Sequence, residues 1–291
     1  MSENLMLDPR YVKILNLEQN SPEWYEFRTD KIGASEFASL AGVKGLSSNK
    51  FNSTYYSMLY KKLKDKYRPN SSNWQSLAME IGSVSEDYLR DFLFTEHGIE
   101  AIPAVVQSLE HEYIFSSLDG IDLYKDLLVE IKTTSHPATP EEIVSLIEYY
   151  TFQVIQQYLV LGDIKQKNNQ IAVIAILNLL NFNGFNFKEC IDFYPVYRDF
   201  HDTYRIGFSH IGLEDKIIKL SREKWLEMCS DFIKDLRELE IELYINRPER
   251  VIEMKELKTP RDFSDIKSKI ISHMLKIDSG GSKSLLEKYL K

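Results

Sequence analysis

The chain has 291 residues, of which 43% are hydrophobic and 12% aromatic, and its net charge is −8. That length can bury one large core or two smaller ones, and no apolar run approaches the roughly 18 residues of a membrane span, so we expect a cytoplasmic protein with no membrane partner. Cys190 and Cys229 lie far apart with no CxxC neighbour, which speaks against a zinc site and a disulfide framework.

Helices are predicted in the first third of the chain. The segment SPEWYEF starts with serine, proline and glutamate at 21–23, a helix-start pattern, and GASEFASLAG at 33–42 has small and apolar residues at helical spacing. Residues 51–66 and 78–97 repeat apolar side chains every three or four positions. We therefore expect two short helices followed by two longer ones.

Strands are predicted in the middle of the chain. After residue 100 the runs AIPAVVQS, YIFSSLDGID and LLVEIKTT are short, rich in β-branched residues and separated by turn residues, which predicts three antiparallel strands. Residues 140–162 begin with proline and two acids and end at a glycine, which predicts a helix. The runs IAVIAILNL and ECIDFYPVYRD then predict two further strands.

The last predicted element is a long, charged, amphipathic helix over 214–245. The order of elements predicts an α/β (α+β) fold in which a central mixed β-sheet is flanked by helices. We expect one domain over 1–210 and a helical C-terminal extension over 211–291.

The charge is unevenly distributed along the chain. A negative protein is a poor candidate for DNA binding, because Lys and Arg contacts to phosphate supply most non-specific affinity. However, residues 43–70 hold seven Lys or Arg against one Asp, and residues 246–291 hold eleven against seven acids. Lys61 and Lys62 in the first segment are candidate DNA contacts. A protein that gathers carboxylates around a metal can also be acidic overall, so the total charge excludes little.

The most specific pattern is SLDGID followed by VEIK, which contains Asp119, Glu130 and Lys132. Residues i and i+2 of a strand face the same way, so Glu130 and Lys132 project together while Ile131 points into the core. Asp119, from the neighbouring strand or turn, can meet them. Two carboxylates and a backbone carbonyl suit Mg²⁺ or Mn²⁺, and a lysine beside them can hold the attacking water or stabilise a phosphorane. The same spacing also fits an ordinary exposed Glu–Lys pair.

Other polar residues are weaker candidates. Glu86 lies on a predicted helix and can add a third carboxylate, although taken alone it fits a solvated helix residue. Gln153 and Gln157 are four residues apart on the helix after VEIK and share one face, an arrangement that also occurs on ordinary helix surfaces. Asp122 is a rival ligand, but it follows a glycine turn and is expected to face elsewhere.

Four of these segments together resemble a known family. WYEFRTDKIGASEFASLAG, GSVSE, LDG with VEIK, and YYTFQVIQQYLVLG occur in the order and at the spacing of the phage lambda-type exonucleases, or YqaJ-like viral recombinases, of the PD-(D/E)xK nuclease superfamily. The resemblance covers about residues 20 to 200. The sequence departs from the family pattern at Leu118, Gln156 and Leu161. These residues neighbour the candidate site residues but are not metal ligands themselves. It implies a restriction-endonuclease-like core.

The resemblance also implies residue roles. Asp119, Glu130 and the Ile131 carbonyl would bind Mg²⁺ or Mn²⁺, with Glu86 as the additional acid. Lys132 would be the catalytic lysine, and Gln157 is the preferred glutamine of its helix.

Arg28 and Ser35 match the residues that hold a 5′-phosphate in the family, and Gln153 is a further candidate DNA contact. A guanidinium can grip phosphate with two hydrogen bonds, and a helix N-terminus offers free N–H groups. The alternative is that Arg28 pairs with a local acid and Ser35 only caps its helix.

By resemblance, the chain is expected to degrade one strand of duplex DNA with free ends in the 5′-to-3′ direction. The resemblance further implies a phage- or prophage-encoded protein acting in a bacterial host, a single-strand annealing protein as partner, and a homo-oligomer, commonly a trimeric ring around DNA. Two alternatives remain. One is an endonuclease of the same superfamily, and the other is a non-catalytic DNA-binding assembly protein on the same scaffold.

Overall fold

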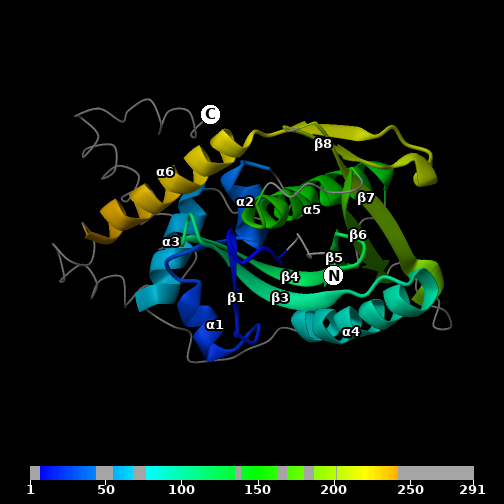
Figure 1. Ribbon diagram of the computed structural model, residues 1–291, viewed down its shortest axis with the longest axis horizontal. Helices are drawn as coiled ribbons and strands as arrows, with labels where there is room; N and C mark the ends of the chain where they lie inside the picture. Colours follow the sequence, from blue (N-terminus) through cyan, green and yellow to red (C-terminus); the bar gives the residue numbers. More distant parts are fainter. Residues whose placement is uncertain are drawn as a thin grey trace.

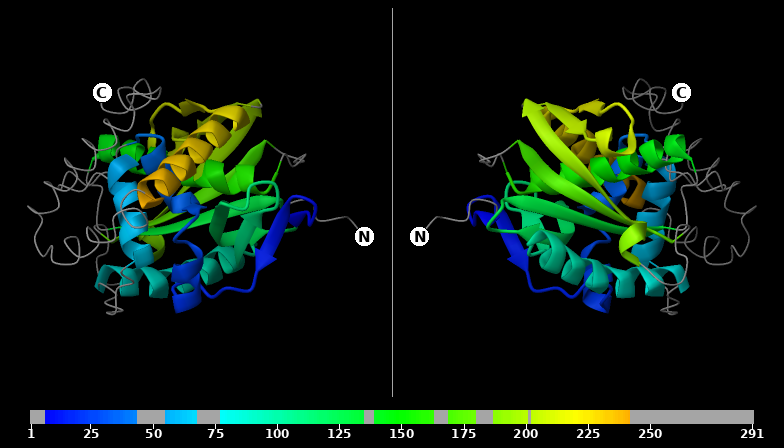
Figure 2. Two further views of the ribbon diagram at one scale, coloured as in Figure 1. Left: turned by 90° about the vertical axis from the view of Figure 1, so that its left-hand side faces the viewer. Right: turned by 90° about the vertical axis from the view of Figure 1, so that its right-hand side faces the viewer.

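The computed structural model describes residues 7–43, 55–67, 77–134, 139–162, 169–179, 187–200 and 202–241, and the statements below concern these residues. They form one mixed sheet with helices on both faces (Figures 1 and 2). The helices are α1 (Pro22–Phe27), α2 (Ala34–Leu40), α3 (Tyr55–Tyr67), α4 (Leu77–His97), α5 (Pro140–Val160) and α6 (Arg222–Glu240). The strands are β1 (Val12–Leu15), β2 (Ile32–Gly33), β3 (Ile102–Ser108), β4 (Ile114–Asp122), β5 (Leu127–Thr134), β6 (Gln170–Asn178), β7 (Ile191–Phe200), β8 (Thr203–Ile206) and β9 (Lys216–Lys219).

The sheet is mixed, as the order of elements predicts. Its strands follow the order β1-β3-β4-β5-β6-β7-β8-β9, and β2 pairs with β4. The predicted antiparallel run β3-β4-β5 is confirmed, and β5 and β6 are parallel. Parallel neighbours need a crossover connection, which α5 supplies between β5 and β6. This helix therefore lies across the strand that carries Glu130 and Lys132.

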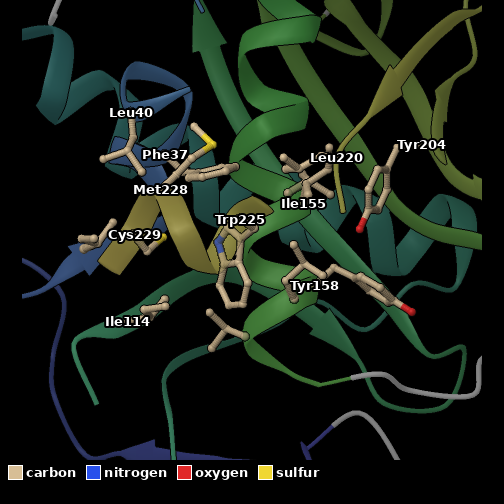
Figure 3. Packing of buried hydrophobic residues seen from close by; sticks show 14 of the residues in the cluster. Phe37, Leu40, Ile114, Ile155, Tyr158, Tyr204, Leu220, Trp225, Met228 and Cys229 are labelled. Atoms are coloured by element: carbon tan, nitrogen blue, oxygen red, sulfur yellow. The ribbon is translucent and has the colours of Figure 1, made fainter. Parts of the chain in front are cut away.

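The two faces of the sheet have separate cores. Helices α2, α3, α5 and α6 pack on one face, in a cluster that includes Phe37, Tyr158 and Trp225 (Figure 3). Helix α4 covers the other face, where Leu89 and Leu93 pack against β5 and β6. The first five residues of β5, from Leu127 to Ile131, are thereby buried, which removes water from Glu130, whereas Lys132 stays partly exposed.

Helix α5 begins where its local sequence indicates. The Thr139 side chain accepts a hydrogen bond from the Glu142 N–H, the Glu142 side chain accepts one from the Thr139 N–H, and Pro140 occupies the first turn. This capping box satisfies donors that the helix leaves free at its start. It sets the beginning of the helix, and with it the positions of the glutamines further along.

The helix predicted over 214–245 is wrong at its start. Lys216–Lys219 form β9, which is hydrogen-bonded to β8, and the helix begins only at Arg222, after the N-cap Ser221. The short KIIK run pairs with the sheet edge, and tertiary pairing overrides the charged helical pattern. The expected boundary at 210 thus falls between two paired strands. The basic segment 246–291 lies outside the described residues.

Helix α6 contributes to the core that α2, α3 and α5 form on one face of the sheet. Trp225 is fully buried, and Met228 and Cys229 belong to the same cluster (Figure 3), which also includes Phe232. None of the described helices is long and apolar enough to cross a membrane.

Gly120, next to Asp119, is required by close packing. A Cβ at this position would lie 2.5 Å from Ala101 Cβ and 3.0 Å from its Cα. Gly120→Ala is therefore expected to lower the free energy of unfolding by about 1–3 kcal/mol, as for other overpacked cores. Urea unfolding measures the change.

Gly82 on α4 is the matched control for Gly120. An added Cβ would meet no described atom within 4 Å, so Gly82→Ala should be neutral or stabilising by up to about 1 kcal/mol. Equal stability changes in the two variants would contradict the packing explanation.

Candidate active site

The β4–β5 hairpin brings together the three residues of the SLDGID and VEIK segments. In this antiparallel pair of strands, Asp122 lies opposite Leu127 and Gly120 lies opposite Val129. One residue further along β4, Asp119 Oδ2 accepts a hydrogen bond from the Ile131 N–H at 2.9 Å. The Asp119 side chain thus takes an N–H of the neighbouring strand, which holds its carboxylate beside the next residues of β5.

Three oxygens converge on the ammonium group of Lys132. Lys132 Nζ donates hydrogen bonds to Asp119 Oδ2 and to the Ile131 carbonyl oxygen, both at 2.9 Å, and forms an ion pair with Glu130 Oε1. These groups are the ligands that the sequence predicts for a metal. The side chain of Ile131 points to the opposite face and is buried, as the alternation predicts. The site is therefore built to surround a cation with oxygens.

Glu130 lies in a fully buried environment. Its Oε2 accepts a hydrogen bond from Gln157 Nε2 at 2.7 Å, and its own exposure is 0%. Burial, followed by repulsion from Asp119, raises the pKa of Glu130 to about 8. Burial alone would lower the pKa of Lys132, but Asp119 and Glu130 raise it well above its usual value. The preference for Gln157 over Gln153 is consistent with this contact.

Glu86 lies near these residues without joining them. Its carboxylate pairs with Arg90 at 3.1 Å, and burial, followed by repulsion from Asp119, raises the pKa of Glu86. Among the residues that the structure describes, no group of three or more His, Cys, Asp and Glu could hold a metal ion. The ligand set supported by this geometry is two carboxylates and one carbonyl, and Glu86 as a ligand stays a prediction.

Arg90 is a site residue that the sequence reasoning missed. Its Nε donates to the Asp119 backbone oxygen at 2.9 Å while its other nitrogens hold Glu86 and Asp87. A cation four residues after Glu86 on a predicted helix was the available signal. Arg90 connects α4 to the end of β4 and so fixes the backbone at Asp119.

Tyr150 was also missed, although it lies seven residues before Gln157 on the same helical face. The Lys132 ammonium is 5.5 Å from the centre of its ring, a cation–π distance. The aromatic ring thereby covers the side of Lys132 that faces α5.

The donor set fits a hard divalent cation. Carboxylate and carbonyl oxygens are the ligands that Mg²⁺ and Mn²⁺ prefer. Asp119 Oδ1 accepts no hydrogen bond from the described residues, which leaves this oxygen for a ligand. Asp122 does not contribute, because its oxygens accept N–H groups of Glu100, Tyr124 and Lys125 and hold the β4–β5 turn. The expectation that Asp122 faces elsewhere is confirmed.

Arg28 lies at the end of α1, and its guanidinium stacks 4.2 Å from the centre of the Trp24 ring. Its Nη2 is 3.5 Å from Glu36 Oε1, the local pairing that the alternative interpretation describes. Ser35 is exposed in the first turn of α2, whose N-cap is Gly33, so Ser35 does not cap this helix.

Trp24 connects the region around Arg28 to strand β4. Its Nε1 donates to Ser117 Oγ at 3.1 Å, and Ser117 precedes Asp119 by two residues on β4. Residues two apart on a strand face the same side. Arg28 and the carboxylate cluster are therefore joined through one indole ring.

The remaining DNA-contact candidates occupy different environments. Gln153 is buried on α5, and Lys61 is exposed on α3. Lys62 is buried, and its ammonium pairs with Glu36. Of the basic segment 43–70, the structure describes residue 43 and residues 55–67.

Comparison with known proteins agrees with this geometry. The family model described as the YqaJ-like viral recombinase domain matches residues 23–163. Residues 23–163 are therefore similar to a YqaJ-like viral recombinase domain. The matched range contains Arg28, the whole β4–β5 hairpin and the helix of Gln157. The family and the convergence of oxygens on Lys132 together support a nuclease.

Solved structures are similar over most of the chain. A crystal structure of LHK-Exo in complex with dAMP has 18% identity, a TM-score of 0.48, and covers 80% of this chain and 100% of its own. A phage-related exonuclease from Haemophilus somnus 129PT has 14% identity, a TM-score of 0.43, and covers 72% and 92%. Both TM-scores are below 0.5. No curated protein matches the sequence.

Proposed function

We propose that this chain is a metal-dependent DNA exonuclease that degrades one strand of linear duplex DNA from its 5′ end and leaves 3′ overhangs. The observation that carries the proposal is the convergence of Asp119, Glu130 and the Ile131 carbonyl on a single cationic group within the YqaJ-like domain. Carboxylates with a raised pKa, as burial gives Glu130, are concentrated at functional sites, which supports the proposal.

Asp119, Glu130 and the Ile131 carbonyl would hold Mg²⁺ or Mn²⁺. Such an ion would supply an activated water and would neutralise charge on the phosphate. Gln157 orients Glu130 through its 2.7 Å hydrogen bond, and Arg90 holds the backbone of Asp119. The Lys132 ammonium would donate hydrogen bonds to phosphate oxygens or to the attacking water. The burial of Glu130 strengthens the electrostatic interactions of its carboxylate.

The same site would serve an endonuclease, so the substrate test must separate free ends from internal bonds. Purified protein with Mg²⁺ is expected to shorten linear duplex DNA and to leave covalently closed circles intact. Gel electrophoresis of both substrates over time gives the answer. Cutting of closed circles would favour an endonuclease, and binding of DNA without metal-dependent turnover would favour a non-catalytic assembly protein.

The 5′ polarity depends on Arg28, whose stacking on Trp24 places a guanidinium beside the catalytic strand. Arg28→Gln is expected to reduce kcat/KM on 5′-phosphorylated duplex by about tenfold to a hundredfold, the loss expected for a charge-assisted hydrogen bond in a polar site. The rate on 5′-hydroxyl duplex should change little, because that end offers no terminal phosphate. End-labelled duplexes with and without the phosphate measure both rates.

Arg10→Gln is the control for this prediction. Arg10 is an exposed arginine that pairs with Asp8 just before β1, and its loss should leave both rates unchanged. If Arg28→Gln slows both ends by the same factor, Arg28 does not recognise a 5′-phosphate.

We extend the proposal to a single-strand annealing protein as partner and to a ring of three copies around DNA. A ring would retain DNA by topology, so it would need less positive surface than an enzyme that holds DNA by charge alone. Its occurrence in a bacterial host as a phage or prophage product belongs to the same proposal. Sedimentation equilibrium of the full chain distinguishes a trimer from a monomer or dimer.

A further inference from the structure

A buried ion pair lies directly behind Arg28. Lys62 on α3 is 4% exposed at its side chain, and its Nζ is 2.8 Å from Glu36 Oε2 on α2. The same ammonium donates to the Arg28 backbone oxygen at 2.8 Å. Burying a lysine is costly unless its charge is paired and its protons are bonded, and both conditions are met here. The pair therefore ties three helices together at the point where Arg28 emerges.

The two oxygens of Glu36 are not equally occupied. Oε2 accepts hydrogen bonds from Lys62 and from the Gly33 N–H, each at 2.8 Å, whereas Oε1 is 3.5 Å from Arg28 Nη2. A separation of 3.5 Å is at the limit of a hydrogen bond. Glu36 is thus held firmly by Lys62 and only loosely by Arg28, whose guanidinium rests instead on Trp24.

We propose that Lys62 is a positioning residue that prevents Glu36 from capturing Arg28, so that the guanidinium remains available for a terminal phosphate. This inference rests on the proposed 5′-phosphate site. Glu36 and a phosphate are both anions that compete for Arg28. With Lys62 present, the three side chains carry two positive charges and one negative charge, a net charge of +1. Without Lys62 the net charge falls to zero, and Arg28 is the remaining cationic partner of Glu36.

The ionisation of Glu36 agrees with this role. Burial would raise the pKa of Glu36, but Lys62 and Arg28 lower it below its usual value. The carboxylate is therefore charged at neutral pH and is a real competitor of the phosphate. Lys62 was predicted to contact DNA directly, and its burial assigns it a position behind the contact residue instead.

The test compares the binding of two ends of DNA. A fluorescent duplex with a 5′-phosphate and one with a 5′-hydroxyl are titrated with the full chain in EDTA, so that no cleavage is needed. The measured quantity is the ratio of the two dissociation constants. Lys62→Met is expected to reduce the preference for the phosphorylated end about tenfold, by weakening that end alone. The double variant Glu36→Gln with Lys62→Met should return to within about threefold of the wild-type ratio, since glutamine is not an anion.

Two further variants keep the test decisive. Lys62→Gln retains a hydrogen-bond donor but removes the charge, so it replaces Lys62→Met if that variant does not fold, as judged by thermal melting. Lys61→Met is the control, because this exposed neighbour should affect both ends equally. An unchanged ratio in a folded Lys62 variant, equal weakening of both ends, or failure of the double variant to recover the ratio would each overturn the inference. If the wild-type protein bound both DNA ends equally well, the proposed phosphate site and this inference would both be overturned. Metal-dependent cleavage would not be affected by that result, because the Asp119→Asn variant tests it independently.

Discussion

Replacing Asp119 with asparagine is expected to reduce Mg²⁺-dependent cleavage of linear duplex DNA by about a thousandfold or more, the scale of losing a main electrostatic contact in an active site. The change removes the negative charge that Asp119 brings to Lys132, yet keeps the size of the side chain. The Oδ1 of asparagine can still accept the hydrogen bond from the Ile131 N–H, so the hairpin should fold. Single-turnover cleavage of an end-labelled duplex measures the loss.

Asp122→Asn is the matched control, since it makes the same chemical change on the same strand. Asp122 accepts two backbone N–H groups at the β4–β5 turn and one from Glu100, and its hydrogen bonds involve none of Asp119, Glu130 and Lys132. We expect wild-type turnover and a stability loss of about 1 kcal/mol, the value of one hydrogen bond. If both variants lose turnover equally while remaining folded, the metal site has been assigned to the wrong carboxylate.

Glu130→Gln is expected to stabilise the metal-free protein at high pH while it abolishes turnover. The pKa of Glu130 is about 8 in the folded protein against 4.5 for the free side chain. Below pH 4.5 the carboxyl is protonated in both states, so it costs nothing. Between pH 4.5 and 8 the unfolded chain loses the proton first, and wild-type stability falls as pH rises. Above pH 8 the full cost is present, and the variant should be more stable by roughly 2–4 kcal/mol.

The neighbouring glutamine can accommodate this change. Gln157 Oε1 is buried and accepts no hydrogen bond from the described residues, while Nε2 holds Glu130. Rotation of the Gln157 amide would present Oε1 to an amide at position 130 and preserve the contact. The substitution therefore removes a charge without leaving a new unpaired group, which is the condition for a net gain in stability.

Urea unfolding in EDTA at pH 5, 7 and 9 measures the effect. The stability gain should be smallest at pH 5 and largest at pH 9, and added Mg²⁺ should stabilise the wild type more than the variant, because only the wild type keeps both carboxylate ligands. Glu100→Gln, an exposed change, serves as the control. A gain of the same size at every pH would mean that packing, not the buried charge, is responsible.

Local sequence determined most of the elements that carry the site. Strand alternation placed Glu130 and Lys132 on one side and Ile131 on the other, and a helix spacing of four placed Gln157 among the candidates. Proline and acidic residues marked the start of α5. These features depend on neighbours within a few residues, so periodicity alone contains them.

Only the tertiary structure decided how distant segments meet. The KIIK strand pairs with β8, Lys62 turns inward to Glu36, Arg90 reaches the Asp119 backbone, and Trp24 bonds to Ser117. Each contact joins residues from different elements. From the sequence alone, each of these side chains or segments could equally well be exposed to solvent. Burial increases the free-energy cost of an unpaired polar group, and burial depends on how the elements pack. Residue types and spacing therefore indicate Asp119, Glu130 and Lys132 as the proposed catalytic residues. Packing between elements determines which charged side chains lie next to them.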